Sequence, residues 1–147
     1  KKKIISIPPT YFFIAVVYII GCFLFLPPVI QIKLYFYLGL LFILLGLFLI
    51  LGSYYLLKKN NTTKSFSPST HLVQEGLYGF SRNPMYLGAT VFLFGLAVLS
   101  NNLFSFVGPV FFFSIMHFMF IPYEEEKAEK EFGRNYLKYK QKVRRWL

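Results

Sequence analysis

The chain has 147 residues, of which 56% are hydrophobic and 21% aromatic, and its formal net charge is +10. This composition excludes an ordinary water-soluble domain, and the long apolar stretches indicate an integral membrane protein. The 16 Lys and Arg residues lie almost entirely outside those stretches, which favours contact with anionic headgroups over nucleic acid. We expect one domain, residues 1–147, and a single cysteine excludes an intrachain disulfide framework.

The apolar stretches predict an all-α membrane protein with about four transmembrane helices, since roughly 20 apolar residues cross the hydrocarbon core. Proline pairs bound the first stretch. The Gly108-Pro109 pair is expected to kink the fourth stretch or to mark where its regular helix begins. The expected spans are residues 10–26, 34–57, 84–99 and 103–121.

Small residues recur at heptad spacing in two of these spans. Gly39, Gly46 and Ser53 follow one another every seven residues in the second span, and Gly88 and Gly95 do so in the third. Such residues lie near one face of a helix and permit close helix packing. The alternative is that glycine is simply common in membrane helices.

Positive charges separate the polar segments into two groups. They gather at the N-terminus, in residues 58–82 and in the C-terminal tail, whereas the turns after the first and third spans hold only Lys33. The positive-inside bias therefore predicts that both termini and the segment before the third span face the cytoplasm.

A polar C-terminal segment, residues 122–147, follows the fourth span. Pro122 is expected to end that span and to start a helix with three consecutive glutamates, from Glu124, in its first turn. Gly133 is expected to bend this amphipathic helix, whose aromatic residues should lie at the bilayer boundary. The apolar positions at helical spacing are Ala128, Phe132, Tyr136, Tyr139, Val143 and Trp146.

The segment from Gly76 to Gly88 holds more specialised residues than a connector needs. Asn83 is expected to cap a helix that starts at Pro84, because its side chain can accept a hydrogen bond from an unpaired N–H group. The remaining free N–H groups and the Arg82 guanidinium would then face one small volume. Together they predict a receptor for a carboxylate or phosphate.

Simpler explanations of Arg82 and of the acidic run stay open. An arginine beside a span can reach lipid phosphates, and acids favour a helix N-terminus. These explanations do not account for three consecutive acids, half of all acids in the chain, beside the other proline-started helix. We predict that Glu124 or Glu125 pairs with Arg82 or accepts hydrogen bonds from a ligand.

The two histidines are further candidates. His117 lies two turns before Glu124 at membrane depth, where it could contact a substrate or bond to another helix. His71 is a weaker candidate. The sequence has no metal-ligand cluster, phosphate-binding loop or nucleophile motif, so we expect chemistry without a metal or a covalent protein intermediate.

These motifs resemble those of the isoprenylcysteine carboxyl methyltransferase and phospholipid methyltransferase superfamily. The resemblance covers the C-terminal half, whereas the first two spans agree only in hydropathy. Asn83 stands where many members have histidine, so acid-base behaviour of that histidine does not carry over. The matching positions are Gly76, Tyr78, Arg82, Asn83, Pro84, Met85, Tyr86, Gly88, Glu124, Glu125, Phe132, Gly133, Tyr136, Tyr139, Val143, Arg145 and Trp146.

The resemblance implies S-adenosyl-L-methionine as methyl donor, bound at the cytoplasmic face between residues 70–88 and 122–147. It implies a lipophilic acceptor, a carboxylate, amine or thiol, that enters from the bilayer. Arg82 and Glu125 are the implied positioning residues for catalysis, and His117 is the candidate on the acceptor side. The implied donor-binding residues are Gly76, Tyr78, Arg82, Asn83, Pro84, Tyr86, Glu124, Glu125, Tyr136 and Tyr139.

Two other functions fit the sequence. Sterol reductases of membranes share a related C-terminal half and use NADPH, so an enzyme similar to them is the first alternative. A non-catalytic membrane protein that keeps the fold for assembly or lipid binding is the second. Protection against thermal unfolding by NADPH would favour the former, and binding of neither nucleotide would favour the latter.

Overall fold

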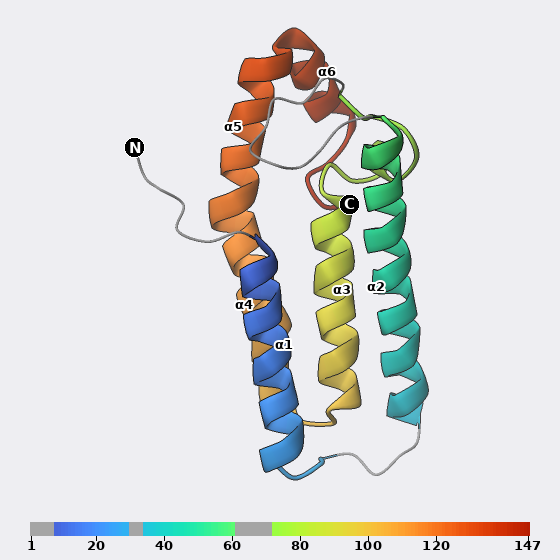
Figure 1. Cartoon of the computed structure of the whole chain (residues 1–147), viewed down its shortest axis with the longest axis vertical. Helices are drawn as coiled ribbons and strands as arrows, with labels where there is room; N and C mark the ends of the chain where they lie inside the picture. Colours follow the sequence, from blue (N-terminus) through green and yellow to red (C-terminus); the bar gives the residue numbers. More distant parts are fainter. Residues whose placement is uncertain (1–7, 30–33, 61–71) are drawn as a thin grey trace.

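A computed structural model describes residues 8–29, 34–60 and 72–147. Within these ranges the chain is helical and has no strand, which confirms the predicted all-α class for them. The helices run up and down along one long axis, and the α5 and α6 end projects beyond the bundle (Figure 1). They are α1 (Pro8–Phe25), α2 (Leu34–Lys59), α3 (Pro84–Leu99), α4 (Val107–Ile115), α5 (Ile121–Phe132) and α6 (Arg134–Lys142).

Several sequence predictions fall outside the described residues. These include His71, the N-terminal lysines, Lys33 and most of the polar segment between the second and third spans. The predicted site segment 70–88 is described from Leu72 onward.

Three helical stretches in the described ranges are long and apolar enough to cross a membrane: Pro8–Phe25, Leu34–Lys59 and Leu103–Phe132. Their length and composition indicate an integral membrane protein. Helix α3 has the predicted bounds but only 16 residues, or about 24 Å of rise against a hydrocarbon core of about 30 Å. A fourth complete crossing stays a prediction.

Helices α2 and α3 pack through the small residues that the sequence singled out, as predicted. A Cβ added at Gly46 would lie 2.6 Å from the backbone nitrogen of Phe92, and one at Gly88 would lie 2.9 Å from the Gly46 carbonyl oxygen. One added at Gly95 would lie 2.8 Å from the carbonyl oxygen of Gly39. This backbone contact fixes the position of α3, whose first residue follows Asn83.

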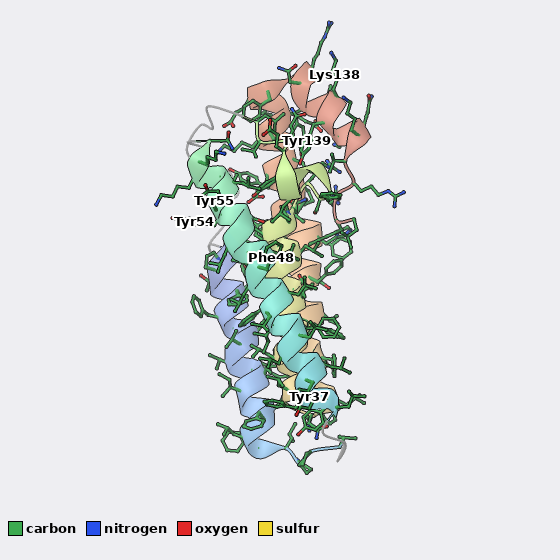
Figure 2. The ribbon with its side chains drawn as sticks, turned by 90° about the vertical axis from the view of Figure 1, so that its right-hand side faces the viewer. Tyr37, Phe48, Tyr54, Tyr55, Lys138 and Tyr139 are labelled. Atoms are coloured by element: carbon green, nitrogen blue, oxygen red, sulfur yellow. The ribbon has the colours of Figure 1, made fainter. Side chains whose placement is uncertain are left out.

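The outer face of α2 carries large exposed side chains. Tyr37 and Tyr54 lie near its two ends, and Phe48 projects between them (Figure 2). The two tyrosines are separated by roughly 26 Å along the axis, at about 1.5 Å per residue. Because tyrosine favours both membrane interfaces, this spacing is typical of a lipid-facing helix.

The fourth predicted span is longer than expected. A 3-10 turn (Leu103–Phe106) precedes α4, so the Gly108-Pro109 pair lies where the regular helix begins, one of the two predicted outcomes. A π-helical turn (Met116–Phe120) then joins α4 to α5. Helix α5 has Pro122 in its first turn, as predicted, but the helical stretch continues through the proline without a break, because a wide π turn just before it relieves its clash with the preceding turn. The end of the membrane span at Pro122 stays a prediction.

The C-terminal segment is not the single helix predicted from its spacing. Helix α5 ends at Phe132, Gly133 has a φ of +51°, and α6 begins at the next residue. The bend at Gly133 is thus confirmed, but Tyr136 and Tyr139 are buried against the protein instead of facing lipid. Trp146 lies beyond the end of α6.

Substitution of Gly133 by alanine is expected to lower the free energy of unfolding by about 1–3 kcal/mol, because a side chain is strained at this backbone conformation. No described heavy atom lies within 4 Å of the added Cβ, so the cost would report strain alone. Thermal unfolding in detergent would measure it. Gly21→Ala is the matched control, since its Cβ also has no described neighbour within 4 Å but lies in regular helix; equal losses would contradict the explanation.

Candidate functional site

The segment before α3 forms one wall of the candidate site. A short 3-10 turn (Gly76–Gly79) buries the Tyr78 side chain, and Gly76 adopts a φ of +59° there. The chain then passes through Arg82 and Asn83 to Pro84, which is buried at the start of α3. These residues lie at the end of the bundle from which α5 and α6 project (Figure 1).

Asn83 precedes α3 as predicted, but its expected capping bond is absent: its side chain makes no hydrogen bond to the free N–H groups of α3. The amide nitrogen instead donates to the Arg145 carbonyl oxygen at 3.2 Å. The prediction of a side-chain cap is therefore wrong, because the amide is directed toward the C-terminal tail.

The C-terminal tail, residues 143–147, follows α6 and is held against this wall by hydrogen bonds to its backbone carbonyl oxygens. The Arg82 N–H donates to the Arg144 carbonyl at 3.0 Å. The Ser81 hydroxyl donates to the Arg145 carbonyl at 3.4 Å, the same oxygen that Asn83 contacts. Segments more than sixty residues apart in the sequence therefore form one site.

Helix α5 forms the second wall of the site, and its Glu125 contacts two arginines. Arg82 Nη1 lies 3.0 Å from Glu125 Oε1, and the two side chains are only 8% and 7% exposed. Arg145 donates from Nε to Oε1 at 3.1 Å and from Nη2 to Oε2 at 2.8 Å. The structure thus brings together Arg82 and Glu125, and one carboxylate faces two guanidinium groups.

The Arg82 guanidinium has unused hydrogen-bonding capacity. Its Nε and Nη1 atoms are buried and have no hydrogen-bond partner among the described residues, although Nη1 is close to Glu125. The buried Tyr78 hydroxyl also has none. Unmade hydrogen bonds of a buried charged group are costly, so these donors suit an anionic or polar ligand.

Glu124 and four tyrosines lie around Arg82 and Glu125. Tyr86, on α3, donates to Glu124 Oε1 at 2.6 Å, which joins the two walls a second time. Tyr139 donates to the Tyr78 carbonyl at 2.6 Å. Burial raises the pKa of Tyr78, Tyr136 and Tyr139, so these phenols stay neutral hydrogen-bonding groups at physiological pH.

His117 lies in the π-helical turn. Its Nδ1 accepts from the Trp146 indole N–H at 3.0 Å, and both rings stack with Phe113. The sequence left open whether His117 contacts a substrate or bonds to another helix. The structure shows a bond within the protein, and its partner is the C-terminal tail. The contact ties that tail to the fourth span.

Trp146→Phe is expected to loosen the tail while the stacking on Phe113 is kept. The lost hydrogen bond to His117 is worth about 0.5–1.5 kcal/mol, so amide exchange in residues 143–147 should accelerate severalfold. Hydrogen exchange read by mass spectrometry would measure this, with the exposed Leu147→Ala as control. Unchanged exchange in Trp146→Phe would show that the hydrogen bond to His117 does not help to hold the tail.

Sequence reasoning assigned no role to Arg145 or Lys140, although Arg145 was part of the motif. Lys140 lies 3.9 Å from Glu125 Oε2 and 2.6 Å from Glu129 Oε1. Many basic residues occur near the C-terminus, and their pattern does not show which of them turns inward. The one signal was that Arg145 belongs to the motif and stands directly before Trp146.

Two curated proteins are similar to part of this chain. An uncharacterised protein of Haemophilus influenzae is 36% identical over 63 residues, which are 43% of this chain and 100% of that protein. Protein-S-isoprenylcysteine O-methyltransferase B of Arabidopsis thaliana is 36% identical over 76 residues, 49% of this chain and 36% of that protein. The match thus spans about a third of the plant enzyme. No solved structure matches significantly.

The phospholipid methyltransferase family matches residues 34–135. This range covers well over half of the chain and includes α2, α3, α4 and α5, with Arg82, Glu124 and Glu125. It confirms the resemblance drawn from the sequence motifs. The chain belongs to the phospholipid methyltransferase family of membrane proteins.

Proposed function

We propose that this protein transfers a methyl group from S-adenosyl-L-methionine to a lipophilic acceptor at the cytoplasmic face of the membrane. The observation that carries the proposal is the buried Arg82 guanidinium, which keeps two nitrogens without a hydrogen-bond partner among the described residues. It lies within residues 34–135, the range that matches the phospholipid methyltransferase family. The name of the plant relative, an O-methyltransferase, supports the same reaction class.

The residues present fit the donor. Arg82 has a planar fork of donors that matches the methionyl carboxylate. Glu124, half-buried and bonded to Tyr86, would accept from the donor's ribose hydroxyls or amino group. The rings of Tyr78, Tyr136 and Tyr139 would line the adenine or face the sulfonium. Gly76, Asn83 and Pro84 shape the wall that carries Arg82.

The protein's contribution to such a reaction is alignment and exclusion of water. When bound, the donor would supply a methyl group that the acceptor's nucleophilic atom attacks directly, so that the bond to the methyl carbon forms as the methyl–sulfur bond breaks and S-adenosylhomocysteine leaves. Arg82 and Glu124 would hold the two ends of the donor, and the fastened C-terminal tail would cover it. No group on the chain needs to form a covalent bond with the methyl.

The basic residues at the site end support a cytoplasmic placement. Lys58 and Lys59 end α2, and α6 carries exposed Arg134, Lys138 and Lys142. Figure 1 places both helix ends at the same end of the bundle. The positive-inside bias then assigns residues 70–88, residues 122–147 and both termini to the cytoplasm.

The experiment is transfer of isotope-labelled methyl from S-adenosyl-L-methionine to membrane lipids, thiols and amines, followed by mass spectrometry. Label in a lipid extract with the purified protein in vesicles is the expected result. Label should be lost with Arg82→Ala and kept with the exposed Arg134→Gln. Absence of transfer, combined with thermal protection by NADPH, would contradict the proposal and favour a reductase.

A further inference from the structure

Arg145 and Arg82 compete for the Glu125 carboxylate, and Arg145 has the better geometry. Arg145 contacts both carboxylate oxygens, at 3.1 and 2.8 Å. Arg82 approaches one oxygen at 3.0 Å, but its Nη1 makes no aligned hydrogen bond there. A two-point pair of this kind is stronger and more directional than a single close contact of charges.

We propose that Arg145 is a positioning residue: it holds Glu125 and thereby leaves the Arg82 donors available for the carboxylate of the methyl donor. This inference rests on the proposed function. Arg145 itself does not need to touch the donor. Its effect on binding passes through Glu125.

The fold fixes Arg145 for this task through its own backbone. Its carbonyl oxygen accepts from Ser81 and Asn83, the residues on either side of Arg82. Its guanidinium reaches back to Glu125 on α5. The two arginines are therefore linked twice, through the Glu125 carboxylate that both contact and through the hydrogen bonds of Ser81 and Asn83 to the Arg145 carbonyl oxygen.

The consequence of losing Arg145 follows from charge. Glu125 is 6% exposed, and a buried carboxylate without a partner is strongly unfavourable. With Arg145 removed, Arg82 at 3.0 Å is the nearer of the two remaining cations, since Lys140 lies at 3.9 Å and pairs with Glu129, so Glu125 would turn both oxygens to Arg82. Arg82 would then be occupied by the protein's own carboxylate, and an incoming carboxylate would have to displace it.

The test is titration calorimetry of the purified protein in detergent with S-adenosylhomocysteine, the demethylated donor, which keeps the carboxylate. Arg145→Gln should bind at least about tenfold more weakly than wild type, as expected when a supporting polar partner of a ligand contact is lost. The double variant Glu125→Gln/Arg145→Gln should bind more tightly than Arg145→Gln, because Arg82 is released. Arg134→Gln is the control and should bind as wild type.

Rescue by the second substitution separates positioning from a merely structural role. A structural role predicts that the double variant is no tighter than Arg145→Gln, and that result overturns the inference. So does wild-type affinity in Arg145→Gln. If Arg145→Gln does not fold, Arg145→Lys and Glu125→Gln/Arg145→Lys are compared instead, with the same order expected. Absence of binding by the wild type itself would contradict the proposed function and the inference together.

Discussion

Arg82→Ala is expected to weaken binding of S-adenosylhomocysteine by roughly 100-fold, about 3 kcal/mol, because the carboxylate loses its charge-assisted hydrogen bonds. The side chain is buried, so water cannot replace the guanidinium at low cost. Glu125 keeps its two-point pair with Arg145 in this variant, and the fold should therefore persist. Titration calorimetry would measure affinity, with thermal unfolding as a check on folding.

Arg82→Lys distinguishes charge from geometry. Lysine keeps the positive charge but offers no planar fork, so an intermediate loss is expected. The exposed Arg134→Gln changes net charge as Arg82→Ala does and should leave the affinity unchanged. Equal affinities for wild type and Arg82→Ala would remove Arg82 from the donor site.

Gly46→Ala is expected to lower the free energy of unfolding by about 1–3 kcal/mol. The added Cβ would lie 2.6 Å from the Phe92 backbone nitrogen and 2.7 Å from the Gly88 carbonyl oxygen. Because these are backbone atoms of α3, no change of side-chain rotamer can relieve the contact. Helices α2 and α3 would have to separate.

The control for Gly46→Ala is Gly21→Ala, in the interior of α1, where no described atom lies within 4 Å of the added Cβ. That substitution should be neutral or slightly stabilising, since alanine favours the helix. Thermal unfolding in one detergent would compare them. Because α3 begins directly after Asn83, Gly46→Ala should also weaken donor binding. Similar unfolding temperatures would contradict the close contact of the two helices.

Much of the bundle could be predicted because its causes are local. Helix α3 has the predicted bounds, and α2 runs from Leu34 to Lys59, two residues beyond the predicted end. Apolar length and heptad spacing of Gly39 and Gly46 suffice for this, since in lipid every span must be helical and only small residues allow close contact.

Predictions failed where the sequence pattern does not show the path of the backbone or the surface that covers a helix. Pro122 was expected to separate two helices, but the π turn before it lets the helical stretch continue. The aromatic face that includes Tyr136 was expected at the bilayer, but it packs against Leu72, Ala128 and Phe132. Residue spacing shows that a helix has an apolar face and does not show which surface covers it.

Only part of the candidate site could be predicted, because the rest depends on which segments the fold brings together. The motif resemblance placed Arg82 and Glu125 in one site, and the structure brings them within 3.0 Å. The role of Arg145 depends on the path of the tail, which is set by backbone bonds to residues more than sixty positions earlier. Those same bonds explain why Asn83 does not cap α3.

The central claim is that the buried Arg82 receives the carboxylate of a methyl donor. The most direct measurement compares wild-type affinities for S-adenosylhomocysteine and for 5′-methylthioadenosine, which lacks the amino-acid part, and repeats the comparison in Arg82→Ala. We expect wild type to prefer S-adenosylhomocysteine strongly and Arg82→Ala to lose most of that preference. A preference of the same size in both proteins, or no preference in wild type, would contradict the claim.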